Sequence, residues 1–243
     1  MIRTGTNPEG PRLVLIHSPL TGPSFWRGVH DALWRRGRRA LLARLPAAQH
    51  IHAPYWLTHA SGVAAGLPEE GEVVLVAHSG AGPLLPAIGR LARNRTAGAR
   101  VAGYLFVDSD LPRDGASRLE LFDDPAQAEA LRQRSRGGWL PTWTAADVRA
   151  LVPDPESFVA ELPRTPLALY DESIRVPDDW PDAPCGYLSL SAQHYRGAVR
   201  AAEAAGWPCR ALNAHHFAPL ADPEGIAAAI DALVGDLAAP DPA

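Results

Sequence analysis

The sequence predicts an α/β fold built on a mostly parallel, six-stranded sheet flanked by helices. Six short apolar segments alternate with segments whose apolar residues recur at helical spacing. The third segment, residues 73–76, is rich in β-branched residues and does not alternate with polar ones, which is typical of a strand buried on both faces of a parallel sheet. Helical crossovers between such strands are right-handed, and ligands bind beyond the carboxyl ends of the strands. We therefore look for the functional site in the segments that follow the strands.

The strands and helices follow from apolar patterning and from the Pro and Gly residues that interrupt it. The predicted strands are residues 12–16, 39–45, 73–76, 101–107, 185–190 and 209–212. The predicted helices of the core begin near residue 23, at 55, just after 79, at 195 and at 223, and residues 47–54 are expected to form a loop.

The strand pattern disappears between residues 113 and 184. This segment contains short helical patterns at 125–134, 145–151 and 157–162, separated by several prolines. It is too long for a simple connection between two strands. We therefore expect a helical cap at 113–184, inserted into a core formed by residues 1–112 and 185–243.

Composition narrows the range of partners and chemistries. The net charge is −4 and no basic face or tail is visible, so neither nucleic acid nor an anionic membrane surface is an expected partner. No segment reaches the length of a membrane span, and the polar N-terminus lacks an apolar signal core, so we expect a cytoplasmic protein. A small-molecule substrate is the expected partner, and a homodimer is the assembly to test.

Two further classes of chemistry find little support. All 23 basic residues are Arg, so no Lys can form a Schiff base. His50, His52 and His59 have no carboxylate or Cys at ligand-like spacing, so no metal and no cofactor is expected. Cys185 and Cys209 each follow a Pro and open an apolar segment, which favours two reduced, buried thiols in neighbouring strands.

A candidate nucleophile follows the third strand. Ala77, His78, Ser79, Gly80 and Ala81 form a small-x-Ser-x-small turn between a strand and a helix. The small residues let the backbone turn sharply, and the serine is expected to project above the sheet edge beside a helix N-terminus that favours negative charge.

This turn resembles the nucleophile elbow of the α/β-hydrolase fold, with Ala77 and Ala81 at the two glycine positions of G-x-S-x-G. The resemblance covers residues 13–237, without the first two strands of the larger hydrolase sheet. Within this fold family, the chain is most similar to small, capped, bacterial members that resemble esterases or hydroxynitrile lyases. Such proteins place a catalytic His seven residues before the Pro that opens the last helix, which implies His216 rather than His215.

The resemblance leaves two candidates for the acid of a Ser-His-acid triad. Most relatives carry it after the strand at 185–190, but the segment from Ser189 to His194 has no carboxylate. The alternative family position is the end of the preceding strand, which implies Asp108, and Asp110 could take this place instead.

The resemblance also implies an oxyanion hole, but one residue of this chain differs from the family pattern there. Gly80 would supply one main-chain N–H, and the loop that begins at His17 would supply the other. At the expected donor position stands Pro19, which has no N–H, so Leu20 would have to donate from a shifted loop. Phe25 and Trp143 are candidates for lining a pocket under the cap, although packing in the core or cap is the default interpretation for each.

The sequence thus predicts a serine-dependent hydrolase that acts on a small ester, lactone, thioester or amide through an acyl-enzyme. Ser79 would attack, His216 would act as base and then acid, and Asp108 would orient His216. Pro19 and the missing late acid leave an alternative open: a non-hydrolytic lyase, epimerase or cyclase of specialised metabolism. A small-molecule binding protein without turnover is a third hypothesis.

Overall fold

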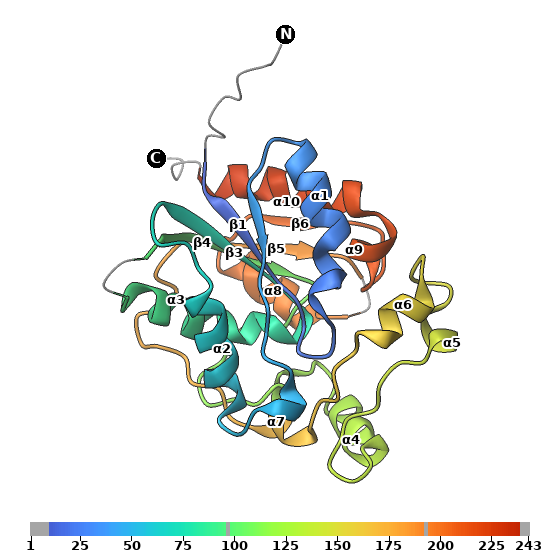
Figure 1. Ribbon diagram of the computed structural model, residues 1–243. Helices are drawn as coiled ribbons and strands as arrows, with labels where there is room; N and C mark the ends of the chain where they lie inside the picture. Colours follow the sequence, from blue (N-terminus) through green and yellow to red (C-terminus); the bar gives the residue numbers. More distant parts are fainter. Residues whose placement is uncertain (1–9, 96–97, 192–193, 239–243) are drawn as a thin grey trace.

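Six parallel strands form the sheet at the centre of the molecule (Figure 1). The computed structural model describes residues 10–95, 98–191 and 194–238. The strand order is β2-β1-β3-β4-β5-β6, and each neighbouring pair is parallel, which confirms the predicted sheet. The strands are β1 (Arg12–Ile16), β2 (Ala40–Leu42), β3 (Glu72–His78), β4 (Arg100–Val107), β5 (Cys185–Ser189) and β6 (Cys209–Ala211).

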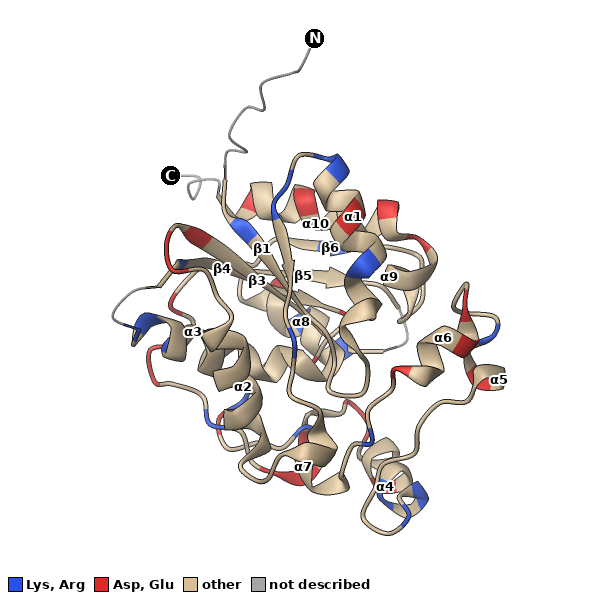
Figure 2. Cartoon of the chain, in the orientation of Figure 1, with Lys and Arg blue, Asp and Glu red and all other residues tan. Residues whose placement is uncertain are grey.

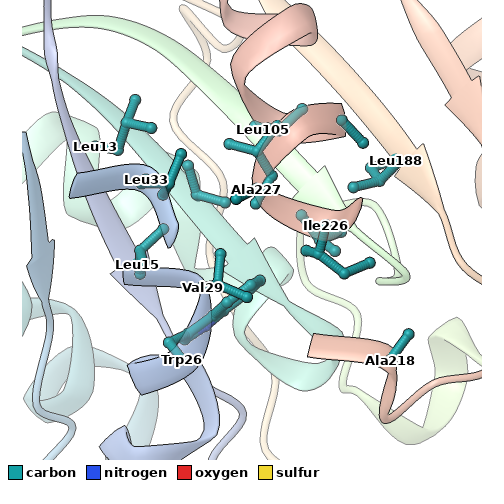
Figure 3. Packing of buried hydrophobic residues seen from close by; sticks show 14 of the residues in the cluster. Leu13, Leu15, Trp26, Val29, Leu33, Leu105, Leu188, Ala218, Ile226 and Ala227 are labelled. Carbon is teal, nitrogen blue, oxygen red and sulfur yellow. The ribbon is translucent and has the colours of Figure 1, made fainter. Parts of the chain in front are cut away.

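Helices cover both faces of the sheet, so its central strands are buried on both sides. Leu13 and Leu15 of β1 pack with α1 (Arg27–Arg35) and α10 (Pro223–Leu237), as the close view of this core shows (Figure 3). The alternate residues Val14 and Ile16 point to the opposite face, where α2 (Tyr55–Ala65), α3 (Leu85–Arg93) and α8 (Arg196–Ala204) lie. This two-sided burial explains why the strands lack polar alternation.

The carboxyl ends of the central strands meet at one edge of the sheet. Ile16 pairs with Ala77, His78 pairs with Val107, and Val107 pairs with Leu188. The segments that follow β1, β3, β4 and β5 therefore emerge side by side, although they are far apart in the sequence. This register brings the predicted site residues into one region.

The chain between β4 and β5 is helical. It forms η4 (Leu119–Leu121), α4 (Pro125–Arg134), α5 (Ala145–Val148), α6 (Pro155–Ala160) and α7 (Leu167–Asp171). Asp124, Thr144 and Asp154 cap α4, α5 and α6 by accepting hydrogen bonds from main-chain N–H groups. Leu119, Ala128, Leu140, Leu169 and Tyr170 form a small apolar cluster of this segment, together with Ala48. The division into a core and a cap stays a prediction.

Several elements differ from the sequence-based expectation. The strand expected at 39–45 is limited to β2, and the expected loop 47–54 contains η2 (Ala48–His50). The elbow helix begins with a 3₁₀ segment, η3 (Ser79–Leu84), and becomes α-helical only at α3, where Pro86 occupies the first turn and needs no hydrogen-bonded N–H. A 3₁₀ turn, η1 (Pro23–Trp26), likewise precedes α1. The short helices α7 and α9 (Ala218–Ala221) were not predicted.

The two cysteines are free and begin neighbouring strands, β5 and β6, as expected. Cys185 is buried, whereas Cys209 is only partly buried. In the view of Figure 2, acidic and basic positions are interspersed over the helices and loops. Within the described residues, no helix is both long and apolar enough to cross a bilayer.

Candidate active site

Ser79 lies on a strained turn at the carboxyl end of β3. Its φ is +56°, a conformation that non-glycine residues adopt rarely and usually where the surrounding structure holds them in it. The Ser109 hydroxyl contributes to this by donating a 2.6 Å hydrogen bond to the Ser79 carbonyl. Glycine at position 82 lets the segment of Ser109 and Asp110 lie close to the turn, because a Cβ there would overlap the Ser109 hydroxyl and crowd the Asp110 carbonyl. The turn therefore has the local geometry expected of a nucleophile elbow.

His216 and Asp108 form a hydrogen-bonded pair at this edge of the sheet. His216 Nδ1 lies 2.8 Å from Asp108 Oδ2. Asp108 immediately follows β4, is fully buried, and has a φ of +44°. Because an ionised carboxylate only accepts hydrogen bonds, Nδ1 carries the proton and Nε2 is left as the basic nitrogen.

Asp108 is held by more than His216. Its Oδ1 accepts hydrogen bonds from the main-chain N–H groups of Leu190 and Ser191, at 3.0 and 3.1 Å, and its Oδ2 accepts one from the Ser191 hydroxyl at 2.8 Å. Burial by itself raises the pKa of the carboxyl, but the hydrogen bonds from His216, Leu190 and Ser191 outweigh burial and lower it. Asp108 is therefore ionised at neutral pH and fixed in orientation.

Asp110, the other candidate acid, points elsewhere. Among the described residues, no hydrogen bond joins its carboxyl group to His216. Burial and the neighbouring Asp123 raise the pKa of Asp110 to about 8, against the opposing effect of Arg118. Asp110 lines a cavity of about 90 Å³ together with Phe122, Asp123, Gln127, His194 and Tyr195. The geometry pairs His216 with Asp108.

Tyr195 is a site residue that the sequence analysis missed. Its hydroxyl shares a 3.2 Å hydrogen bond with Ser79 Oγ, and its ring stacks on that of His216 at 5.7 Å between centroids. In the described part of the chain, no hydrogen bond joins Ser79 Oγ directly to His216. Tyr195 precedes α8 and has a φ of +57°. Its sequence signal is its position just beyond β5, one residue after the segment from Ser189 to His194 that has no carboxylate.

His78 packs behind His216 and supports it. Its ring lies between Phe25 and His216, at centroid distances of 4.4 and 4.3 Å. His78 Nε2 donates to the His216 carbonyl at 3.1 Å. Burial, with the nearby His216, lowers the pKa of His78 well below its usual value, so the ring is neutral. Phe25 is fully buried behind it, and Trp143 is partly buried against Phe217, the residue after His216.

The loop after β1 is held by its own hydrogen bonds. The Leu20 N–H donates to the Ser18 hydroxyl at 3.2 Å, and the Pro19 carbonyl accepts from the Thr165 hydroxyl at 3.1 Å. His17 supports the loop, since its Nε2 accepts from the Leu45 N–H at 3.4 Å. The expected second oxyanion donor, Leu20, is thus already engaged.

Gly80, the expected first donor, is contacted from the segment between β4 and β5. Arg118 is buried and donates from Nε to the Gly80 carbonyl at 2.8 Å and from Nη1 to the Leu169 carbonyl at 2.9 Å. A Cβ on Gly80 would lie 2.7 Å from Tyr170 Oη. Glycine at this position therefore allows the Tyr170 hydroxyl to approach the elbow.

Metal ligation has no support in the described structure. Across residues 10–95, 98–191 and 194–238, His, Cys, Asp and Glu side chains form no group of three that could hold a metal ion. His59, one of the three histidines considered above, instead donates a hydrogen bond from Nε2 to the Pro46 carbonyl at 2.9 Å. Burial, with the nearby Arg118, lowers the pKa of His59 to about 4.

Comparison with known proteins finds similarity in structure only. No protein-family model matches the chain, and no curated protein sequence matches it. An extracellular α/β-hydrolase from a Paenibacillus species is similar at a TM-score of 0.71 and 16% identity, over 92% of this chain and 99% of that one. Tomato methylketone synthase I, in a variant bound to β-ketoheptanoate, is similar at a TM-score of 0.74 and 12% identity, over 93% and 98%. A methylesterase from Arabidopsis is similar at 0.67 and 13% identity, over 93% and 100%.

Proposed function

Because this chain has the α/β-hydrolase fold, we propose that it is a serine hydrolase that cleaves a small ester, lactone, thioester or amide through an acyl-enzyme. The observation that carries the proposal is the 2.8 Å hydrogen bond between His216 Nδ1 and Asp108 Oδ2, at the sheet edge where Ser79 occupies a positive-φ elbow. A nucleophile, a base and an ionised acid, which follow the chain order Ser, Asp, His at one edge of the sheet, are the groups that acyl transfer needs.

The first half of the reaction begins when Ser79 Oγ leaves Tyr195 and turns toward His216 Nε2. Apo sites often show loose catalytic hydrogen bonds that tighten when substrate binds. Nε2 takes the hydroxyl proton as Oγ bonds to the carbonyl carbon, and the carbonyl oxygen becomes an oxyanion. The imidazolium is stabilised by Asp108 and returns the proton to the leaving group as its bond to carbon breaks.

The second half uses the same groups. Water attacks the acyl-enzyme carbonyl, His216 takes one of its protons, and the Ser79 ester bond breaks as the proton passes to Oγ. The product acid leaves and the site is restored. The neutral, buried His78 keeps His216 in position throughout, because its ring packs against that of His216 at 4.3 Å between centroids and its Nε2 donates to the His216 carbonyl.

Turnover of short-chain p-nitrophenyl and thiophenyl esters tests the proposal. We expect wild-type hydrolysis, with loss of at least ~10³-fold in kcat on Ser79→Ala and on His216→Ala. Ser157→Ala is a matched control, since Ser157 lies in α6 and is exposed. Turnover that survives Ser79→Ala would contradict the acyl-enzyme.

One set of observations favours a second function, a non-hydrolytic reaction on the same site. Pro19 has no N–H, the Leu20 N–H is engaged by Ser18, and Ser79 is hydrogen-bonded to Tyr195. One of the similar structures is itself described as a methylketone synthase. This alternative predicts consumption of substrate without an acyl-enzyme, so that Ser79→Ala keeps most of the activity while His216→Ala loses it.

A further inference from the structure

The oxyanion region lacks one main-chain donor, and the loop after β1 does not supply it. A tetrahedral intermediate is stabilised by preorganised donors that point at its oxygen, and removing one donor of this kind typically costs on the order of 10²–10³ in kcat. Gly80 can contribute one N–H. Pro19 has none, and the Leu20 N–H donates to the Ser18 hydroxyl at 3.2 Å. A hydrolase with this loop needs a donor from another element.

The Tyr170 hydroxyl lies beside Gly80, the residue that follows the candidate nucleophile. Tyr170 belongs to α7, is 4% exposed, and places Oη so near Gly80 that an added Cβ would be 2.7 Å away. The side chain of Ser18, near the start of the loop after β1, also forms a hydrogen bond with the Tyr170 hydroxyl. One phenol therefore lies between the residue after the nucleophile and the loop that lacks an N–H.

Neighbouring side chains fix Tyr170 in this position. Arg118 lies over its ring, 5.6 Å from the centroid. The same guanidinium binds the carbonyls of Gly80 and Leu169, so it ties the elbow to α7. Thr165, five residues before Tyr170, donates to the Pro19 carbonyl at 3.1 Å and so connects this segment to the loop after β1. The phenol is thus preorganised, which an oxyanion donor requires.

The protonation state of Tyr170 suits a donor. Burial raises its pKa to about 12, although Arg118 and Ser18 act in the opposite direction. The hydroxyl is therefore protonated at neutral pH, while the positive charge of Arg118 favours negative charge nearby.

We propose that Tyr170 Oη is the second oxyanion donor of this enzyme, in place of the main-chain N–H that Pro19 cannot provide. As Ser79 Oγ bonds to the carbonyl carbon, the π electrons of the carbonyl move to its oxygen, which accepts hydrogen bonds from the Gly80 N–H and the Tyr170 O–H. Tyr170 keeps its proton, and the serine proton goes to His216. The segment between β4 and β5 then contributes a catalytic group, and this role rests on the proposed hydrolysis.

Tyr170→Phe tests the role directly. We expect kcat for a p-nitrophenyl ester to fall about a hundredfold with KM changed less than about threefold, because the donor acts in the transition state. Binding of an alkyl boronic acid, which forms a tetrahedral adduct with Ser79, should weaken by a similar factor. A merely structural role for Tyr170 would not weaken adduct formation in proportion to kcat.

Tyr104→Phe is the matched control. Tyr104 is also a buried phenol, but its hydroxyl donates to Asp182 at 2.8 Å and it packs in the core on the α2, α3 and α8 side of the sheet. This variant should keep wild-type kcat and boronate affinity. Tyr170→Phe with kcat within twofold of wild type would overturn the role of Tyr170 and leave the proposed hydrolysis standing. Wild-type protein that neither turns over esters nor labels at Ser79 would reject both.

A second measurement keeps the test decisive if Tyr170→Phe does not fold. 3-Fluorotyrosine at position 170 keeps the hydroxyl and nearly the same volume, and its ¹⁹F resonance reports on the phenol. We expect this resonance to shift when the boronic acid binds Ser79. An unchanged ¹⁹F resonance in the saturated adduct would overturn the role.

Discussion

Ser79 Oγ and Tyr195 Oη lie 3.2 Å apart, and this hydrogen bond joins the candidate nucleophile to a phenol rather than to the base. Tyr195 lies beyond β5, whereas Asp108, the proposed acid, follows β4 and is hydrogen-bonded to His216. Burial raises the pKa of Tyr195 well above its usual value, so it remains a neutral partner. In the described structure, Ser79 Oγ is therefore hydrogen-bonded to Tyr195 and not to His216.

Tyr195→Phe is expected to increase the reactivity of Ser79. The hydrogen bond to Tyr195 competes with the one that Ser79 must form with His216, and a net contribution of ~0.5–1.5 kcal/mol per hydrogen bond corresponds to roughly a two- to tenfold effect. Second-order labelling by a small fluorophosphonate should rise by a factor in this range. A tenfold decrease would instead assign Tyr195 a part in the reaction itself.

Asp108→Asn is expected to reduce kcat by about 10³–10⁴-fold, because an amide cannot orient and stabilise the His216 imidazolium as a carboxylate does. Asp110→Asn is the matched variant two residues away, and it should retain kcat within about threefold if Asp108 is the acid. Steady-state ester hydrolysis at neutral pH measures both. Reversal of the two effects would assign the acid to Asp110.

Asp110 should also make the free energy of unfolding depend on pH. Its pKa is raised to about 8 in the folded state, so the folded protein holds this proton more tightly than the unfolded chain. This contribution to the free energy of unfolding is fully present below about pH 4, near the carboxyl pKa of an unfolded chain, and is lost as pH rises toward 8.

Asp110→Asn removes this pH-dependent contribution. The free energy of unfolding of the variant minus that of wild type should therefore be larger at pH 8 than at pH 5, by on the order of 1–3 kcal/mol. Urea unfolding at the two pH values measures the change. Asp178→Asn, at an exposed position, is the control. Equal pH dependence in wild type and Asp110→Asn would contradict the raised pKa.

Gly82→Ala should be strongly destabilising. A Cβ at residue 82 meets the Ser109 hydroxyl, the Asp110 carbonyl and the Phe106 ring, none of which can move without disturbing the elbow. We expect a loss of about 2–4 kcal/mol in the free energy of unfolding. Gly235→Ala is the matched control: it is exposed in α10 with nothing within 4 Å of an added Cβ, and it should stabilise by about 0.5–1 kcal/mol. Urea unfolding distinguishes the two.

The sequence-based prediction was most successful where local pattern and strand register determine position. The apolar strand and small residues around Ser79 predicted the elbow. The resemblance to the α/β-hydrolase fold implied His216 with either Asp108 or Asp110, and the structure brings His216 and Asp108 within hydrogen-bond distance of each other. Their catalytic roles stay predictions.

The prediction was least successful in the segment between β4 and β5, where the sequence no longer alternates between apolar strands and helices. Tyr170 approaches Gly80 across 90 residues of sequence, through packing around Leu169 and Arg118 that no periodic pattern encodes. Tyr195 was not predicted because a carboxylate was the residue type expected beyond β5. Such contacts depend on tertiary packing, which overrides local propensity.

Intact-protein mass spectrometry after treatment with a fluorophosphonate tests the central claim most directly. The account predicts a single adduct per chain, mapped to Ser79 by peptide analysis, absent in Ser79→Ala, and formed at least ~10²-fold more slowly in His216→Ala. Ser157→Ala should label at the wild-type rate. Folded wild-type protein that acquires no adduct, or one that maps to another residue and persists in Ser79→Ala, would contradict Ser79 as the nucleophile.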